Sequence, residues 1–229
     1  MQFETLRAKR LVITGGFGVL GRTTAQLALS AGAEVALLDR VDLGGHDPAI
    51  SLAFGDIDLN DEAALGAAFS AISSQWSQID GVFNIAGAFQ WQRVAEAPLS
   101  LWREMFNANL LSAVNTTRAA IPHLRAGSVV VNIAAVAAQK GGVGMGPYTA
   151  SKAGVLRFTE SLARELSPSG VSVYSVSPTI LDTPRNRRDM PEADRTHWVA
   201  PQDVAAKLLS LLEGKVPSGS DIVLGELKS

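Results

Sequence analysis

Cysteine is absent from the 229-residue sequence. This absence excludes disulfide bonds, thiolate metal sites and a cysteine nucleophile, and it is typical of a cytoplasmic protein. Histidine is scarce as well. The three histidines, His46, His123 and His197, are scattered and do not have the spacing of metal ligands, so we expect no metal site.

Long apolar runs and a strong net charge are also missing. The longest apolar stretches have the length of a strand, well below the roughly 20 residues that span a bilayer. The N-terminus has neither the apolar region nor the cleavage site of a signal peptide. The net charge of −2 gives no reason to expect nucleic acid or an anionic membrane as a partner. We therefore expect a cytoplasmic protein that acts on a small molecule.

Short apolar runs alternate with amphipathic segments along the whole chain. The runs are rich in Val, Ile and Leu without polar alternation, as is typical of parallel strands covered on both faces. About seven strands are expected, at Leu11–Thr14, Val35–Asp39, Leu52–Gly55, Gly81–Ile85, Val129–Ile133, Val171–Val176 and Ile222–Leu224. Helices are expected between them, near residues 19–31, 61–75, 99–121, 148–166 and 202–213. This alternation predicts an α/β fold: one Rossmann-type domain over residues 1–229, with a single doubly wound parallel sheet and helices on both faces.

A polar, proline-containing segment, Thr183–Ala200, follows the sixth expected strand. It is long for a connection in a compact domain, so we interpret it as a substrate lid; the alternative is a plain surface loop. Four arginines lie close to Trp198 in this segment. They are suited to meet an anionic or planar group, or else they form a solvated loop balanced by nearby acids.

The first expected strand runs into a glycine-rich segment, TGGFGVLG, at residues 14–21. Glycines between a strand and a helix allow a tight turn and a close approach of the backbone to a pyrophosphate at the helix N-terminus. A plain turn is the alternative, but this position favours dinucleotide binding. The expected cofactor-binding residues here are Gly15, Phe17, Gly18, Val19, Leu20 and Gly21.

Asp39 ends the second expected strand, and Arg40 follows it. A carboxylate at this place can accept hydrogen bonds from the adenosine ribose and would repel a 2′-phosphate, which favours NAD(H). The guanidinium of Arg40 could pair with such a phosphate, so NADP(H) remains possible.

Two further segments follow expected strands. Asp58 and Leu59 come after the third strand, where the carboxylate could reach the adenine; alternatively, this region simply caps a helix. Asn84, Ala86 and Gly87 belong to the NIAG segment at the end of the fourth strand. The small residues leave room for a cofactor and Asn84 can brace the neighbouring backbone, whereas a plain turn is the alternative.

Tyr148 and Lys152 are four residues apart in an expected helix, so they share one face. A nearby ammonium favours the phenolate and lowers the pKa of the tyrosine toward a useful range. The sequence therefore predicts that Tyr148 donates a proton to a substrate that receives a hydride from a nicotinamide.

Together these motifs resemble the short-chain dehydrogenase/reductase family over almost the whole chain, in order and approximate spacing. The resembling segments are TGGFGVLG, Asp39, Asp58, NIAG, Asn107–Asn109, YTASK and SPTILDT. The resemblance implies that Tyr148 is the proton donor, that Lys152 lowers its pKa and binds the nicotinamide ribose, and that Asn109 holds a water in a proton relay. It also implies that the SPTILDT segment binds the nicotinamide carboxamide, through Pro178, Leu181 and Thr183, and that the protein is a homodimer or homotetramer.

The sequence departs from the family pattern in three places. The glycine loop has the spacing TGxxGxxG, and Thr179 stands where a glycine is usual. Most importantly, Ala135 stands where the family has a catalytic serine, and no serine or threonine occurs from residue 133 to 147. Losing one donor to a developing oxyanion costs about 2.7–4 kcal/mol, a serious defect for a general ketone reductase.

The alanine is also a feature of one branch that this chain resembles, the dihydropteridine reductases. Their glycine loop and the stretch from Leu181 to Trp198 are similar as well. The resemblance implies an NADH-dependent reductase of an electrophilic quinonoid or conjugated substrate, with Ala135, Trp91 and Trp198 on the substrate side. The alternatives are a general carbonyl or alcohol oxidoreductase and a non-catalytic nucleotide-binding sensor.

Overall fold

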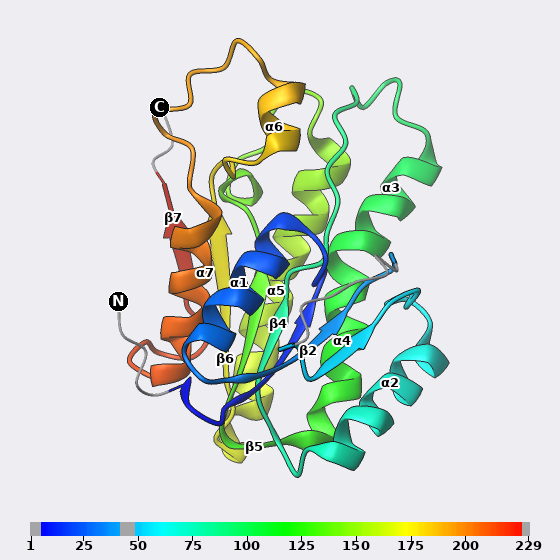
Figure 1. The fold of residues 1–229 in the computed structure, drawn as a ribbon. Helices are drawn as coiled ribbons and strands as arrows, with labels where there is room; N and C mark the ends of the chain where they lie inside the picture. Colours follow the sequence, from blue (N-terminus) through cyan, green and yellow to red (C-terminus); the bar gives the residue numbers. More distant parts are fainter. Residues whose placement is uncertain (1–5, 42–48, 226–229) are drawn as a thin grey trace.

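The computed structural model describes residues 6–41 and 49–225. Seven parallel strands form one sheet in the order β3-β2-β1-β4-β5-β6-β7, with helices packed on it (Figure 1). The strands are β1 Arg10–Thr14, β2 Glu34–Leu38, β3 Leu52–Phe54, β4 Ile79–Asn84, β5 Leu124–Ile133, β6 Ser172–Pro178 and β7 Asp221–Leu224. The predicted fold class, a doubly wound parallel sheet of Rossmann type, is confirmed.

Every strand expected from the sequence is present, and β5 differs most in its bounds. It begins at Leu124, five residues before the expected start at Val129. Leu124 is buried, but residues 125–127 that follow it are exposed and include Gly127 with a φ of +86°. The pairing with β4 shifts register between Ile79 and Gly81 at the same level. An apolar run cannot reveal a strand segment that lies outside the core.

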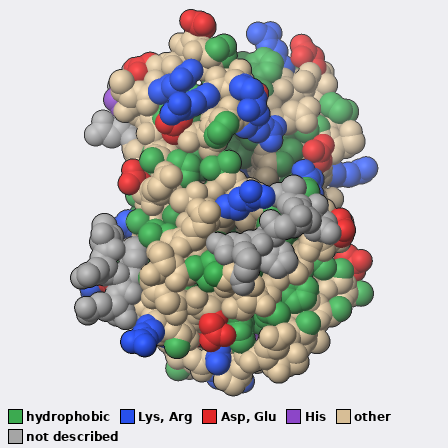
Figure 2. Space-filling view, viewed as in Figure 1, with side chains coloured by type: hydrophobic (Ala, Val, Ile, Leu, Met, Phe, Trp, Pro, Cys, Tyr) green, Lys and Arg blue, Asp and Glu red, His purple; other side chains and the backbone are tan. Residues whose placement is uncertain are grey.

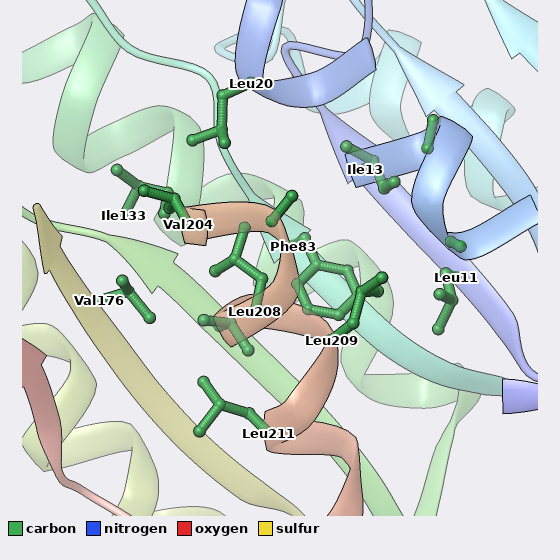
Figure 3. Packing of buried hydrophobic residues seen from close by; sticks show 14 of the residues in the cluster. Leu11, Ile13, Leu20, Phe83, Ile133, Val176, Val204, Leu208, Leu209 and Leu211 are labelled. Carbon is green, nitrogen blue, oxygen red and sulfur yellow. The ribbon is translucent and has the colours of Figure 1, made fainter. Parts of the chain in front are cut away.

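Helices cover both faces of the sheet. Helix α1 (Val19–Ser30) packs beside α7 (Pro201–Ser210) on one face, and α2 (Glu62–Gln75), α4 (Ser112–Ala120) and α5 (Gly146–Leu166) lie on the other. Leu11 and Ile13 of β1 belong to the core under α1 and α7 (Figure 3), whereas Val12 points to the opposite core. Strand residues that are mostly Val, Ile and Leu are buried in both cores, which explains why these strands lack polar alternation.

The helix expected over residues 99–121 is interrupted. Helix α3 (Leu99–Phe106) continues into a π-helical turn, Asn107–Leu111, and then into α4. The segment contains no glycine or proline that would signal a break. Single π turns occur frequently at functional sites, and this one contains Asn109.

The Thr183–Ala200 segment contains a short helix, α6 (Pro184–Asp189), that was not expected from the sequence. The two ends of the segment are held close together, because Leu181 pairs with Val199 in an isolated parallel bridge. Figure 1 places α6 at the end of the sheet where β1, β4 and β6 finish. We call residues 183–200 the lid segment.

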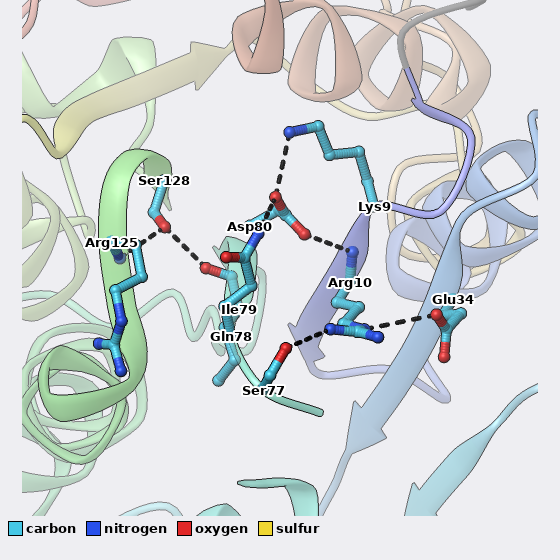
Figure 4. Close-up of polar contacts among 9 residues, drawn as sticks. All are labelled: Lys9, Arg10, Glu34, Ser77, Gln78, Ile79, Asp80, Arg125 and Ser128. Atoms are coloured by element: carbon cyan, nitrogen blue, oxygen red, sulfur yellow. Dashed lines mark hydrogen bonds and ion pairs between the residues drawn. The ribbon is translucent and has the colours of Figure 1, made fainter. Parts of the chain in front are cut away.

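The opposite end of the sheet is held by polar contacts (Figure 4). The buried carboxylate of Asp80 accepts hydrogen bonds from the Lys9 ammonium and from the backbone N–H of Arg10, each at 3.0 Å. The hydroxyl of Ser128 donates to the carbonyl of Ile79 at 2.7 Å. These contacts tie the starts of β1, β4 and β5 together, far along the strands from the glycine loop.

Within the described ranges, no helix is long and apolar enough to cross a membrane. No group of three or more His, Cys, Asp or Glu residues is placed to hold a metal ion in that part of the chain, and His46 lies outside it.

Candidate active site

The strand order reverses between β1 and β4, and the crevice outside their carboxyl ends is where doubly wound sheets bind nucleotides. The hydroxyl oxygen of Thr14, at the end of β1, accepts hydrogen bonds from the N–H groups of Ile85 and Ala86, at 3.1 and 3.2 Å. Gly15 follows with a φ of +63°, and a Cβ there would lie 2.9 Å from the backbone of Ala86. Only glycine fits this junction of the two strands.

The rest of the glycine loop fits a dinucleotide pyrophosphate. The Gly18 N–H donates to the Gly15 carbonyl at 3.0 Å, and Gly18 precedes α1 without a side chain that caps the helix. A Cβ on Gly21 would clash with the carbonyl of Gly15. The first turn of α1 has no acidic side chain. Its backbone N–H groups and the positive end of its dipole are therefore available to a phosphate.

The structure places the other expected residues of the glycine loop around the start of α1. The side chain of Leu20 is buried in the core, whereas Val19 is exposed and Phe17 is half-buried. Leu20 can therefore contribute only its backbone to a cofactor site.

The carboxylate of Asp39 lies beside the glycine loop. One oxygen accepts a 2.9 Å hydrogen bond from the N–H of Phe17, and the other lies 3.3 Å from the N–H of Val41. Arg40 is exposed. The carboxylate that would favour NAD(H) thus lies against the glycine loop, and the exposed Arg40 follows it in the chain, so both cofactor predictions stay open.

Asp61, rather than Asp58, caps α2, accepting hydrogen bonds from the N–H groups of Ala63 and Ala64. Asp58 is exposed and accepts a 2.9 Å bond from the N–H of Asn60. The side chain of Leu59 is buried in the core. Asp58 is therefore free of a capping role, and Leu59 offers only its backbone.

Asn84 lies in a buried network and not at the surface of the crevice. Its amide donates to Thr117 at 3.0 Å and to Asn132 at 2.8 Å, and Asn132 in turn donates to Thr159 at 2.9 Å. The network joins α4, β4, β5 and α5 beneath the site. Asn84 was predicted to brace the neighbouring backbone, whereas these hydrogen bonds run to side chains, so that role stays a prediction. Asn132, Thr117 and Thr159 were missed because nothing in the sequence pairs them.

Tyr148 and Lys152 lie in the first two turns of α5, with Lys152 buried. The Lys152 ammonium donates to the main-chain carbonyl of Ile133 at 2.7 Å. Ala135, two residues further along, is buried as well. The Tyr148 hydroxyl has no hydrogen bond to any residue that the structure describes, and its ring stands edge-on to Phe89 with the ring centroids 4.9 Å apart.

The prediction that Lys152 lowers the pKa of Tyr148 is wrong for the protein alone, because the pKa of Tyr148 is raised. Burial raises the pKa of Tyr148 to about 12, and burial lowers the pKa of Lys152 to about 8. The lysine ammonium is directed at the Ile133 carbonyl. Desolvation therefore decides both shifts, and Tyr148 is held protonated near neutral pH.

Asn109 connects two walls of the site. Its side-chain oxygen accepts from the N–H of Ala88 at 2.9 Å, while its amide donates to the carbonyl of Ala88 and to the hydroxyl of Ser151, both at 3.0 Å. A Cβ on Gly87 would lie 2.7 Å from the same side-chain oxygen. The side chain is thus fully engaged, and a relay water would have to contact the main chain of Asn109. The relay stays a prediction.

The segment after β6 forms the far side of the crevice. Pro178 is the last residue of β6, and Leu181 pairs with Val199 at the base of the lid segment. The hydroxyl oxygen of Thr183 caps α6, accepting from the N–H of Asn186 at 3.2 Å. Its O–H remains able to donate to a carboxamide. Thr179, which departs from the family pattern, donates to the carbonyl of His197 at 3.2 Å and so holds the returning end of the lid segment.

The charges of the lid segment are largely balanced. Arg187 makes two hydrogen bonds to the carboxylate of Asp182, which hold the pKa of that carboxyl below its usual value, and Arg185 lies 3.5 Å from Asp189. Arg195 lies 5.6 Å from the ring centroid of Trp198. These contacts favour the solvated-loop interpretation for Arg185 and Arg187. Figure 2 shows Lys and Arg side chains gathered over this end of the molecule and the surface hollowed below them.

Trp91 lies on the segment between β4 and α3 and contacts the loop that leads into α5. Its indole N–H donates to the carbonyl of Val143 at 3.0 Å, and the N–H of Gln92 donates to the carbonyl of Gly144 at 2.8 Å. A Cβ on Gly144 would clash with the indole. The segment after β4 is thereby fixed next to the helix that carries Tyr148, while the ring of Trp91 remains half exposed.

Known proteins share this arrangement. The sequence model described as short chain dehydrogenase matches residues 9–194. The chain is 30% identical to 3-hydroxyacyl-CoA dehydrogenase type-2 of Drosophila melanogaster over 81% of this chain and 79% of that protein. A short-chain dehydrogenase/reductase structure from Brucella melitensis, titled glucose/ribitol dehydrogenase, has a TM-score of 0.88 with 25% identity, covering 98% of this chain and 97% of that one.

A second structure, a short chain dehydrogenase from Burkholderia cenocepacia in complex with NADP, has a TM-score of 0.81 with 24% identity, covering 96% and 97% of the two chains. At this identity the likeness shows the fold. None of these three relatives is named a dihydropteridine reductase, so that resemblance rests on the sequence motifs alone. The family match, the crevice and the Tyr148–Lys152 pair agree, and the chain belongs to the short-chain dehydrogenase/reductase family of NAD(P)-dependent oxidoreductases.

Proposed function

We propose that this protein is an NAD(P)H-dependent reductase of strongly electrophilic substrates, quinonoid or conjugated, as in the dihydropteridine reductase branch. The observation that carries the proposal is Ala135, which presents a buried methyl group where the family pattern has a serine that hydrogen-bonds the substrate oxygen. A substrate that accepts hydride at an electron-poor centre needs less stabilisation of a developing oxyanion. One proton donor can then suffice.

Tyr148 is the remaining donor. Its hydroxyl has no hydrogen-bond partner among the described residues, and burial raises its pKa to about 12. The phenol therefore keeps its proton near neutral pH and can give it to an oxygen or nitrogen of the substrate that becomes basic during the reaction. Bound NAD(P)H would supply the hydride.

Lys152 and Asn109 support this step in different ways. Lys152 is anchored on the Ile133 carbonyl and, since burial lowers its pKa to about 8, it can exchange a proton near neutral pH. It is also the residue that would bind the nicotinamide ribose. Asn109 ties Ala88 to Ser151, one turn after Tyr148, and so fixes the helix relative to the opposite wall.

NAD(H) is the cofactor that we favour. The Asp39 carboxylate lies against the glycine loop, where it can accept hydrogen bonds from ribose hydroxyls and repel a 2′-phosphate. Arg40 supports NADP(H) as the second possibility. In this proposal residues 1–229 act as one cytoplasmic domain, residues 183–200 close over the substrate, and the protein forms a homodimer or homotetramer with no nucleic acid or membrane partner.

A general carbonyl or alcohol oxidoreductase is the second candidate. It is favoured by the likeness to a 3-hydroxyacyl-CoA dehydrogenase, whose named substrate is a secondary alcohol. A non-catalytic sensor has less support, because a pure nucleotide binder needs neither the phenol of Tyr148 nor the buried ammonium of Lys152.

The proposal is tested by measuring the oxidation of NADH and NADPH with quinonoid dihydropterin, quinones, α-diketones and simple ketones. We expect turnover of the first three classes and a kcat/KM for simple ketones at least a hundredfold lower. Fast reduction of simple ketones would support the second candidate. Cofactor binding without turnover of any substrate would support the sensor.

A further inference from the structure

An aromatic surface lies beside the proton donor. Phe89 and Trp91 follow β4, and both side chains are half exposed, with exposed fractions of 45% and 51%. The ring of Phe89 meets the ring of Tyr148 edge-on, at an interplanar angle of 88°. Two large apolar side chains exposed on one short segment beside a catalytic group favour a binding surface over scattered exposure.

The backbone that carries Phe89 is fixed. Both polar groups of the preceding residue, Ala88, are hydrogen-bonded to the side chain of Asn109, at 2.9 and 3.0 Å. Asn109 is buried and also bonded to Ser151 of α5. The backbone before Phe89 is therefore held by hydrogen bonds to Asn109, and the ring of Phe89 packs edge-on against Tyr148.

Trp91 is fixed independently. The indole N–H is bonded to the carbonyl of Val143, and the indole packs on Gly144. Val94 packs on Gly146, two residues before Tyr148, and Val94 and Val143 are also exposed. Together Phe89, Trp91, Val94 and Val143 form what we call the aromatic wall. These four side chains are uncharged, so the wall offers rings and methyl groups.

Building on the proposed function, we infer that the aromatic wall selects substrates whose reacting carbon is conjugated to a planar ring. The pre-positioned ring of Phe89 receives the ring of the substrate, either offset-stacked or edge-on, while Tyr148 faces the reacting group. A planar ring gains both apolar burial and quadrupole contacts there, whereas a puckered saturated ring gains only the burial.

A matched pair of α-diketones separates these contributions. 1-Phenyl-1,2-propanedione and 1-cyclohexyl-1,2-propanedione are similar in size and both are electrophilic, but only the first has a planar ring. We expect kcat/KM to be about three- to tenfold higher for the phenyl compound, mostly through KM, since one aromatic pair contributes on this scale. In Phe89→Leu the ratio should fall to about one, because leucine provides apolar burial without a ring.

Val223→Ala is the matched control, because Val223 is a half-exposed apolar residue on the edge strand β7. It should leave the phenyl preference intact. A wild-type ratio near one, or a ratio unchanged in Phe89→Leu, would overturn the inference. If neither diketone is turned over, the proposed function fails, but the wall can still be tested by calorimetric titration of both compounds into the NAD⁺-loaded protein. Equal affinities for the two compounds would overturn the inference. Tighter binding of the phenyl compound, lost in Phe89→Leu, would support it.

Discussion

The Lys152 ammonium donates a 2.7 Å hydrogen bond to the main-chain carbonyl of Ile133, the last residue of β5. This bond joins the helix that carries the proton donor to the strand end that is followed by Ala135. The lysine is 4% exposed, and burial lowers its pKa to about 8.

Lys152 should give the stability of the protein a characteristic pH dependence. Its pKa is lowered from 10.5 to about 8 in the folded state, so between these values the unfolded chain binds more protons. Stability must therefore rise with pH over this window, by about 2 kcal/mol from pH 7.5 to 10. Urea unfolding of the wild type and of Lys152→Met measures this rise, which the variant should lack. The exposed Lys140→Met is the control, and an unchanged slope in Lys152→Met would contradict the assignment.

Tyr148→Phe should remove the proton donor while leaving the fold intact, because the hydroxyl makes no hydrogen bond to any described residue. We expect kcat to fall about 10²- to 10⁴-fold. The dissociation constant for NADH, measured by fluorescence titration, should change little. A loss of activity below tenfold would show that another group donates the proton.

Asp39→Ser should shift the cofactor preference toward NADPH. The substitution removes the carboxylate that repels a 2′-phosphate and leaves Arg40 available to bind it. We expect the ratio of kcat/KM for NADPH to that for NADH to rise by about tenfold or more, which corresponds to about 1.4 kcal/mol. Steady-state kinetics with both cofactors measures the ratio. If the ratio stays constant, Asp39 does not contact the ribose.

Asn84→Ala should destabilise the fold without touching the reacting groups. It leaves the buried side-chain oxygen of Asn132 without the donor that lies 2.8 Å away. An orphaned buried acceptor costs about 1–3 kcal/mol, and urea unfolding should show a decrease of this size. The exposed Ser74→Ala, whose hydroxyl only bonds back within its own helix, is the control. Equal stability in both variants would mean that the network is not coupled to folding.

The sequence predicted the sheet well because buried parallel strands need uniform apolar runs, which are visible in the residues themselves. It also located Tyr148 and Lys152, since their spacing places them on one helical face. The π turn at Asn107–Leu111 and helix α6 were missed. Both depend on tertiary contacts: Asn109 bonds Ala88, 21 positions away, and α6 rests on the bridge between Leu181 and Val199.

The electrostatics of the site were harder to predict than its residues. The sequence suggested that Lys152 would lower the pKa of Tyr148, but burial dominates both groups. Burial depends on how Phe89 and the neighbouring loops pack, and residue spacing contains no information on that packing. The same holds for the buried network: the register of β4 on β5 places Asn132 opposite Asn84, and the packing of α5 places Thr159 beside Asn132.

The central claim is that Ala135 limits this enzyme to electrophilic substrates. Ala135→Ser restores a second donor, and the most direct measurement is kcat/KM for a simple ketone and for quinonoid dihydropterin in the wild type and this variant. The account predicts a gain of about ten- to a hundredfold for the ketone and a change of less than about threefold for the pterin, because only the first reaction develops a full oxyanion. An equal effect on both substrates would contradict it.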